Sequence, residues 1–204
     1  MPSAETARLV VLDPSALFYH ALQAALARAY DGTIVDACNA TNALQAIDSA
    51  RSALILIGPN WSPPEALRLC RTVRDKSSAI RIVILSALAE ESLLQTDAVY
   101  SGASACLGPA ADAETLVGAL RQVQRGATLF APDILRAAHQ LPKPTPRELD
   151  VLGALAQGKT DREIADALHI SEQTVGTHLR SIFRKLEVHD RRAAVRRARQ
   201  RGWV

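Results

Sequence analysis

A predicted helix from Glu172 to Leu186 carries the side chains best suited to chemistry in this 204-residue chain. Apolar residues recur along it at intervals of three and four, which predicts a buried stripe made of Val175, Leu179, Ile182 and Leu186. The opposite face presents an amide, a hydroxyl, two guanidinium groups and one glycine: Gln173, Gly176, Thr177, Arg180 and Arg184. Such groups hydrogen-bond to base edges and phosphates, and a helix fits the major groove of DNA, about 12 Å wide. The alternative is an ordinary amphipathic helix on the protein surface.

Two further helices are predicted directly before this one, and both start with the same pattern. The segments TPRE, residues 145–148, and TDRE, residues 160–163, each place a hydroxyl at the N-cap and a Glu three residues later. A short turn, LHI at 168–170, then leads to Ser171, which begins the polar helix. Helices joined so closely are typical of a helix-turn-helix, and this spacing argues against the surface-helix alternative.

The stretch TPRELDVLGALAQGKTDREIADALHISEQTVGTHLRSIFRKLEVHDRRAAV resembles the DNA-binding domain of LuxR/NarL-type response regulators. The resemblance implies a small all-α domain of four helices whose third helix enters the major groove of double-stranded DNA. It also implies that the last helix, about 191–201, helps to form a homodimer on inverted-repeat half-sites. The base-contacting positions that it implies are Gly176, Thr177 and Arg180. Because glycine stands where a polar residue is usual, we expect Thr177 and Arg180 to carry most of the specificity.

Other basic residues of this module are expected to hold the DNA backbone. We predict phosphate contacts, against the alternative of a solvated surface, for Lys159, Arg184 and Lys185. His178 lies between the two faces of its helix, which favours packing or phosphate positioning over base contact. The last predicted helix is unusually basic, and some of its arginines must face solvent or a dimer partner because one helix cannot present every side to DNA. Phosphate contacts would make binding fall steeply with salt.

The amino-terminal part of the chain alternates short aliphatic runs with longer helical patterns. Strands are predicted at 8–12, 33–35, 53–57, 80–85 and 103–107, and helices at 15–29, 41–49, 64–73, 90–100 and 112–124. The strands are apolar at successive positions, so helices must cover both of their faces. We therefore predict an α/β fold with a doubly wound, five-stranded parallel sheet. Ligands of such sheets bind in the crevice beyond the carboxyl ends of the strands.

That crevice lacks the groups that phosphoryl transfer needs. The five βα units resemble the receiver domain of a response regulator of flavodoxin-like strand order, through the anchors VVLDPSALFYHAL, IVILSA and GASACLGPAADAETLVGAL. The resemblance implies two acidic residues for Mg²⁺, a phosphoacceptor Asp, a hydroxyl and a Lys, which charge neutralisation requires. Those positions hold, in order, Leu12, Asp13, Gly58, Ser86 and Pro109, and an aromatic switch position holds Cys106. Three of the five groups are missing, so we expect no aspartyl phosphorylation, no metal and no cofactor.

The two groups that remain receive structural roles in this interpretation. We expect Asp13 to cap the following helix and Ser86 to be a core hydroxyl. Trp61 either stacks on a ligand or forms an apolar lid over the empty crevice. The degenerate receiver would then act as a constitutive dimer, or under the control of a small molecule near residues 58–61 or of a partner protein.

Charge is distributed unevenly along the chain in a way that fits two modules. Residues 142–204 hold 13 Lys and Arg against 8 Asp and Glu, net +5, whereas residues 1–141 hold 11 against 13, net −2. A basic module attached to a slightly acidic one is expected of a nucleic-acid-binding protein. We predict a receiver-like domain at 1–125, a linker with a short helix at 126–143 and the DNA-binding domain at 144–204.

The spacing of the cysteines and the length of the apolar runs indicate in which cellular compartment the protein is expected. Cys38, Cys70 and Cys106 form no zinc or disulfide pattern and are expected to be buried apolar residues, with a redox switch as the alternative. No signal peptide and no run of about 18 apolar residues occurs, so we expect a cytoplasmic protein without a membrane partner.

Three functions remain to be compared. The first is a transcriptional regulator that binds DNA as a dimer. The second, a nucleotide-binding or hydrolytic α/β enzyme, would need GxGxxG, a P-loop or GxSxG, and the sequence has none of these, so we expect no enzyme. The third is an interaction protein that titrates other regulators without binding DNA, and the polar helix after a capped helix and turn argues against it.

Overall fold

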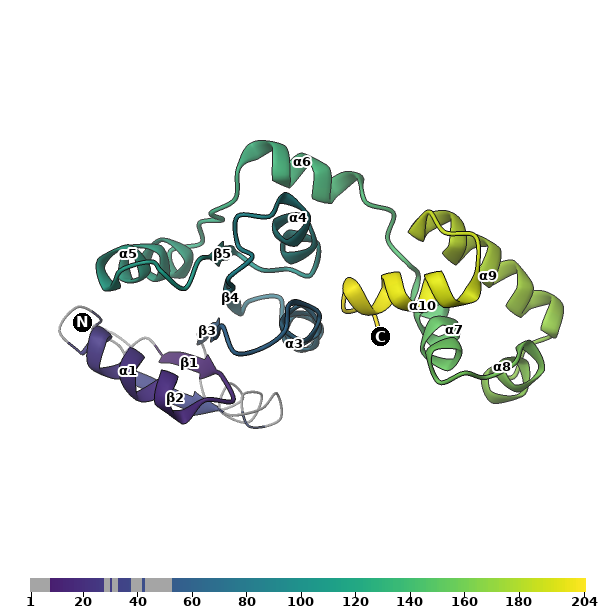
Figure 1. Ribbon diagram of the computed structural model, residues 1–204, viewed down its shortest axis with the longest axis horizontal. Helices are drawn as coiled ribbons and strands as arrows, with labels where there is room; N and C mark the ends of the chain where they lie inside the picture. The colour runs from purple at the N-terminus through teal and green to yellow at the C-terminus, as the bar shows by residue number, and fades with distance from the viewer. Residues whose placement is uncertain (1–7, 28–29, 31–32, 38–41, 43–52) are drawn as a thin grey trace. The chain divides into compact units, whose positions relative to one another are not determined.

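The computed structural model describes residues 8–27, 30, 33–37, 42 and 53–204 (Figure 1). The chain divides into two compact units, Met1–His139 and Gln140–Val204. Apart from Asn42, the helix predicted at 41–49 lies outside the described residues, and so does Cys38. No helix among the residues described is both long and apolar enough to cross a membrane.

The first unit is built on a parallel sheet in the order β2-β1-β3-β4-β5. Its strands are β1 (Arg8–Leu12), β2 (Thr33–Ala37), β3 (Ala53–Ile57), β4 (Arg81–Leu85) and β5 (Ala105–Leu107). β1 lies between β2 and β3, so that Leu12 is in register with Ala37 and Ile57. This is the flavodoxin-like order, and the predicted doubly wound parallel sheet is confirmed. The last two strands are shorter than predicted and begin at Arg81 and Ala105.

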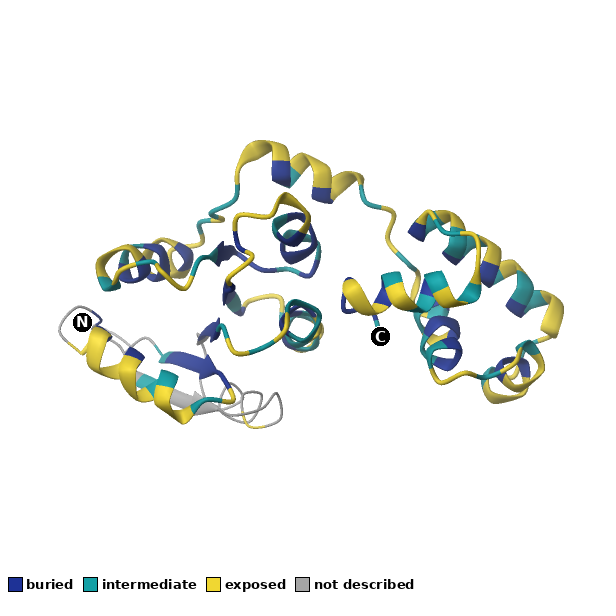
Figure 2. Ribbon diagram, viewed as in Figure 1, coloured by how far each residue is buried: buried dark blue, intermediate teal, exposed yellow. Residues whose placement is uncertain are grey.

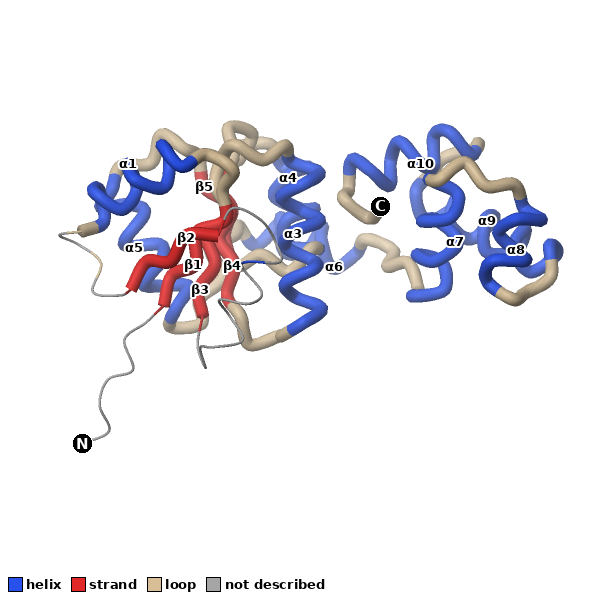
Figure 3. The backbone as a smooth tube through the Cα atoms, turned by 90° about the horizontal axis from the view of Figure 1, so that it is seen from below, coloured by secondary structure: helices blue, strands red, loops and turns tan. Residues whose placement is uncertain are grey.

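Helices cover both faces of this sheet, as the apolar strands require. The helices are α1 (Ala16–Leu26), α3 (Pro63–Lys76), α4 (Ser92–Tyr100) and α5 (Ala113–Gln124), and α6 (Pro132–Gln140) follows. Figure 3 shows α1 and α5 on one side of the sheet and α3 and α4 on the other. Alternate strand residues enter separate cores: Leu12 and Ile57 pack with Leu67 of α3, whereas Val11 and Leu56 pack with Leu120 of α5.

The second unit consists of short helices whose starts are fixed by local hydrogen bonds. The helices are α7 (Pro146–Ala156), α8 (Asp161–Leu168), α9 (Glu172–Leu186) and α10 (Arg191–Gln200). The predicted capping boxes are confirmed at Thr145 and Thr160, and Ser171 accepts from the backbone N–H of Thr174 at 3.1 Å. His169 ends α8 in the left-handed region, with φ 53°, and so forms the turn before α9.

The predicted apolar stripe of α9 is the side that packs inward. Its buried residues are Val175, Leu179, Ile182 and Leu186. α9 contacts α7, α8 and α10, which together form the core of this unit. Figure 2 shows the alternation of buried and exposed residues along these helices. Burial of one stripe leaves the opposite side of α9 facing outward.

Candidate nucleic-acid interface and receiver-like crevice

The outward side of α9 gathers the polar residues that the sequence singled out. Gln173, Thr177, Arg180 and Arg184 are exposed. Within the free chain the Arg180 guanidinium donates to Thr177 Oγ1 at 3.1 Å, and that hydroxyl donates to the carbonyl of Gln173 at 3.0 Å. The side chains of Arg180 and Thr177 are therefore joined by a hydrogen bond, and Thr177 is in turn bonded to the helix backbone at Gln173.

Gly176 and His178 lie at the edges of this surface and are both half-buried. A methyl group added at Gly176 would approach Arg180 Nη1 at 3.8 Å, an ordinary contact distance. The absence of a side chain thus leaves room that Arg180 borders but does not fill. The half-buried place of His178 agrees with packing or phosphate positioning rather than base contact.

The Lys185 side chain points away from the outward side of α9. The prediction that it contacts a DNA phosphate therefore has to be revised. Its ammonium forms an ion pair with Glu148 Oε2 at 2.6 Å and donates to the carbonyl of Lys143 at 2.9 Å. Glu148 is 3% exposed. The ammonium therefore joins the end of α9 to the start of α7, and we no longer expect it to reach DNA. The capping-box Glu was visible in the sequence, but no local signal paired it with a residue 37 positions later.

The ion pair changes the acidity of Glu148. Burial alone would raise its pKa, but hydrogen bonds from Lys185, Ser181 and Thr145 outweigh burial and lower the pKa from 4.5 to about 2. The carboxylate is therefore ionised at every pH at which the protein is expected to work. Its role is structural, since it is the N3 member of the α7 capping box.

The arginines of α10 divide between internal and outward roles. Arg191 bonds to the start of α8, and Arg199 donates to the carbonyl of Ala156 at 3.2 Å. Arg201 follows the helix, is buried, and lies 5.6 Å from the ring centre of Trp203. Arg192 and Arg196 are exposed. This helix therefore turns only part of its charge outward, and the expectation that some of its arginines face solvent or a dimer partner rather than DNA stays a prediction.

The receiver-like crevice is occupied by the protein's own carboxylate. Asp13 is 2% exposed, and its Oδ1 accepts from the backbone N–H of Ser15 at 2.7 Å and from Asn60 Nδ2 at 3.0 Å. Its Oδ2 accepts from the backbone N–H of Asn60 at 3.1 Å. A Cβ atom placed on Gly58 would lie 2.1 Å from Oδ2 and 2.8 Å from the Asp13 Cβ and Cγ. The space that a phosphoacceptor side chain would need is therefore filled.

These contacts also correct the role predicted for Asp13. The N-cap of α1 is Ser15, whose Oγ accepts from the backbone N–H of Phe18 at 3.3 Å, so the prediction that Asp13 caps this helix is wrong. Asp13 instead ties the end of β1 to the loop after β3. Sequence reasoning missed Asn60 as its partner. The available signal was an amide side chain two residues beyond the glycine of the crevice.

The remaining positions of the crevice hold no reactive group. Leu12 is fully buried, Ser86 is buried and accepts from the backbone N–H of Leu88 at 3.3 Å, and Pro109 is exposed. Trp61 packs against the core between the sheet and α3, and its indole N–H donates to the carbonyl of Leu12 at 3.1 Å, which favours the lid over the ligand platform. Within the described part of the chain, no group of His, Cys, Asp and Glu side chains could hold a metal ion.

The described cysteines are free and buried. Burial raises the pKa of the Cys70 thiol to about 12 and that of Cys106 to about 11. Thiols of this kind are almost entirely protonated at neutral pH and react slowly. Their environment favours the packing role over the redox switch.

Comparisons with known proteins find similarity over both parts of the chain. Residues 144–198 match the family model described as bacterial regulatory proteins, luxR family. The chain is 30% identical over 207 residues to the nitrate/nitrite response regulator protein NarP of Escherichia coli, covering 95% of each chain. It is 33% identical over 129 residues to the transcriptional regulatory protein DesR of Bacillus subtilis, covering 63% of this chain and 64% of that protein.

A solved structure of the same fold has DNA bound. The two-component response regulator RcsB in its DNA complex superposes with a TM-score of 0.54 at 15% identity, covering 96% of this chain and 99% of that one. At this identity the likeness concerns the fold alone.

Proposed function

The chain belongs to the luxR family of bacterial regulatory proteins, and on that premise we propose that it regulates transcription in the cytoplasm as a dimeric, DNA-binding response regulator. We further propose that its receiver-like domain works without phosphorylation of an aspartate. The observation that supports DNA binding is the exposed polar side of α9, where Arg180 donates to the hydroxyl of Thr177 beside the exposed Gln173. In helix-turn-helix proteins the second helix lies in the major groove and the first crosses the backbone.

The residues of the interface divide into those that contact base edges and those that hold phosphates. Arg180 reads a guanine edge or holds a phosphate, Thr177 and Gln173 contact base edges, and Gly176 lets the helix approach closely. Arg184 and Lys159 hold phosphates. Dimerisation would place two such helices on inverted half-sites about one turn of DNA apart.

An affinity measurement tests this interface. We expect the protein to bind a fragment of its own upstream region and Arg180→Ala to weaken binding about 10- to 100-fold, since one bidentate base contact contributes about 1–3 kcal/mol. Arg136→Ala is the matched control, because Arg136 is an exposed arginine of α6 outside the interface. Equal effects of the two substitutions, or no binding at low salt, would instead favour the interaction protein that titrates other regulators.

Independence from phosphorylation rests on the crowding at Gly58. A phosphoacceptor side chain there would overlap Asp13, whose carboxylate already accepts three hydrogen bonds. Leu12 and Pro109 stand where the resemblance places a second acidic residue and a lysine, so these positions supply neither a Mg²⁺ ligand nor a positive charge for an acyl phosphate. We therefore expect the intact mass of the protein to stay unchanged after incubation with a small phosphodonor and Mg²⁺. A stable phosphoprotein that disappears on substitution of one aspartate would contradict the proposal.

A constitutive dimer is the simplest mode of action for such a domain. The alternative, a ligand or partner at residues 58–61, has to compete with the bonds of Asn60 to Asp13 and of Trp61 to the carbonyl of Leu12. Light scattering of the full chain without additives distinguishes the two. We expect the mass of a dimer, whereas a monomer would favour control by a ligand or partner.

A further inference from the structure

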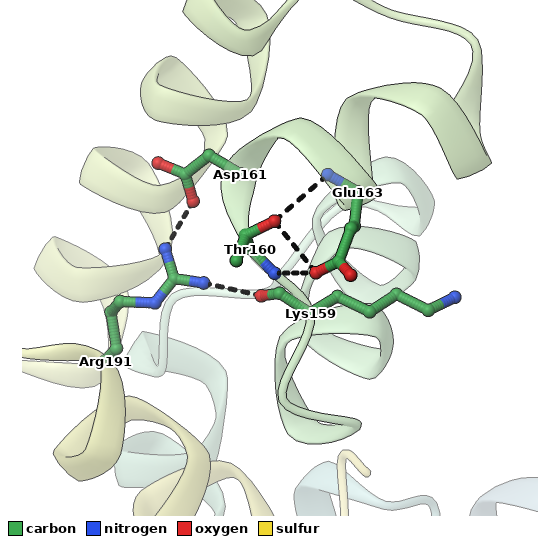
Figure 4. A network of polar contacts seen from close by, with 5 residues as sticks. All are labelled: Lys159, Thr160, Asp161, Glu163 and Arg191. Atoms are coloured by element: carbon green, nitrogen blue, oxygen red, sulfur yellow. Dashed lines mark hydrogen bonds and ion pairs between the residues drawn. The ribbon is translucent and has the colours of Figure 1, made fainter.

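Arg191, the first residue of α10, reaches across to the start of α8. One end of its guanidinium pairs with Asp161 Oδ1, and the other, Nη2, donates to the carbonyl of Lys159 at 2.8 Å (Figure 4). The two partners lie on either side of Thr160, the N-cap of α8. The planar guanidinium suits this arrangement, because its N–H groups point in fixed directions toward two acceptors.

Two carboxylates belong to the first turn of α8, and each has an intramolecular partner. Glu163 accepts from the backbone N–H of Thr160 at 2.7 Å and from its hydroxyl at 2.8 Å. Asp161 has Arg191. Figure 4 also shows the Lys159 side chain extending away from Arg191, while its carbonyl faces the guanidinium. The lysine ammonium thus points away from the ion pair of Arg191 with Asp161.

The pairing of Asp161 with Arg191 affects DNA binding, because the proposed interface brings the start of α8 close to the negatively charged phosphate backbone. Negative charge in the first turn stabilises a helix through its dipole. In a helix-turn-helix, however, the first helix crosses the phosphate backbone, where an unpaired carboxylate repels. Asp161 and Arg191 are 40% and 41% exposed, so their charges act on whatever binds nearby.

We propose that Arg191 is a positioning residue for DNA binding: it neutralises Asp161 and fixes the backbone at Lys159, and it does not itself contact phosphate. The inference rests on the proposed DNA interface of α8 and α9. It assigns to α10 a function in preparing the backbone-binding end of α8. Removal of Arg191 would leave DNA facing the Asp161 carboxylate and a less constrained Lys159.

Affinity for the upstream fragment in four full-length variants tests this role. Arg191→Ala should weaken binding about fivefold, the size of one exposed unit charge at close range. Arg192→Ala removes the same charge from the neighbouring exposed position and should change binding less than about twofold. Asp161→Asn alone should bind as the wild type does or slightly more tightly. Asp161→Asn combined with Arg191→Ala should return affinity to within about twofold of the wild type.

The salt dependence separates positioning from direct contact. The plot of log affinity against log salt loses about 0.9 in slope for each phosphate contact removed. We expect the double variant to keep the wild-type slope. The opposite result would be a double variant that still binds weakly and whose slope is reduced by about one. It would show that Arg191 binds phosphate and would overturn the inference.

The same variants also show whether the substituted protein folds and whether the wild type binds DNA at all. Should Arg191→Ala not fold by circular dichroism, Arg191→Gln gives the same test, because it keeps an N–H donor for the Lys159 carbonyl while removing the charge. Failure of the wild type to bind DNA would refute the proposed function. Normal wild-type binding with an Arg180→Ala defect but no Asp161→Asn rescue would refute the role of Arg191 alone.

Discussion

Two glycines, Gly58 in the receiver-like crevice and Gly176 on α9, stand where the family resemblance places a functional side chain. Around Gly58 the space is filled, since an added Cβ would lie 2.1 Å from the Asp13 carboxylate. Around Gly176 the space is open, with Arg180 Nη1 at 3.8 Å from the same construction. The space beside the first glycine is closed by a neighbouring side chain, and the space beside the second is open.

Asp13 and Glu148, two of the buried carboxylates among the described residues, repeat this contrast. Asp13 is held by uncharged N–H groups of two loops at the crevice. Glu148 is held by the ammonium of Lys185 and by the start of its own helix. The first carboxylate fills the space beside Gly58, and the second joins α7 to the end of α9.

The largest expected effect is a loss of folding stability at low pH that depends on Glu148. Its pKa of about 2 in the folded state lies below the ordinary 4.5, so the stabilisation is complete above pH about 5 and is lost as the pH falls toward 2. A difference of 4.5 − 2, about 2.5 pKa units, corresponds to about 3 kcal/mol. Urea unfolding of the DNA-binding domain within the full chain should show this loss, and Glu148→Gln should remove most of it.

Glu163 provides the matched control, because it occupies the same capping-box position in α8 but is exposed. Hydrogen bonds to Thr160 also lower its pKa. We expect Glu163→Gln to change the acid dependence much less, since solvent screens an exposed carboxylate. Similar acid profiles for both substitutions would mean that the Lys185 pair is not what distinguishes Glu148.

Gly58→Ala should be next in size. The added methyl group would overlap Asp13 in a buried, hydrogen-bonded position, which costs about 1–3 kcal/mol of stability. Urea unfolding followed in the receiver-like domain measures this. In an Asp13→Ala background the same methyl group should cost at least about 1 kcal/mol less, because the carboxylate is gone. Equal costs in both backgrounds would show that the Asp13 carboxylate is not the reason for glycine, since alanine at position 13 keeps the Cβ that lies 2.8 Å from the added atom.

Gly176→Ala should have the smallest effect and the opposite sign. Alanine in a helix interior is favoured over glycine by about 1 kcal/mol, and the site has room for the methyl group. We expect higher stability and DNA affinity within about threefold of the wild type, the scale of a single added apolar contact. Gly153→Ala in α7, which also meets no close atom, should give the same stability gain without any effect on DNA binding. A destabilised Gly176→Ala variant would end the comparison between the two glycines.

Much of the DNA-binding unit could be predicted, because its signals are local. The hydroxyls of Thr145, Thr160 and Ser171 act on backbone groups three residues away, and the stripe from Val175 to Leu186 follows from the helical period. The receiver-like unit was predicted less completely. Asp13 was expected to cap the following helix, but besides the N–H of Ser15 it bonds to Asn60, 47 residues later.

The sequence by itself determined the order of elements, the outward polar side of α9 and the loss of the phosphoacceptor, since each follows from residue type and short-range spacing. Only the tertiary structure decided that Asp13 fills the space beside Gly58, that Lys185 turns inward to Glu148 and that Arg191 reaches the start of α8. The physical reason is that local hydrogen bonds and helical periodicity act within about one turn. Charged side chains 30 to 47 residues apart meet their partners only after the helices and strands have packed.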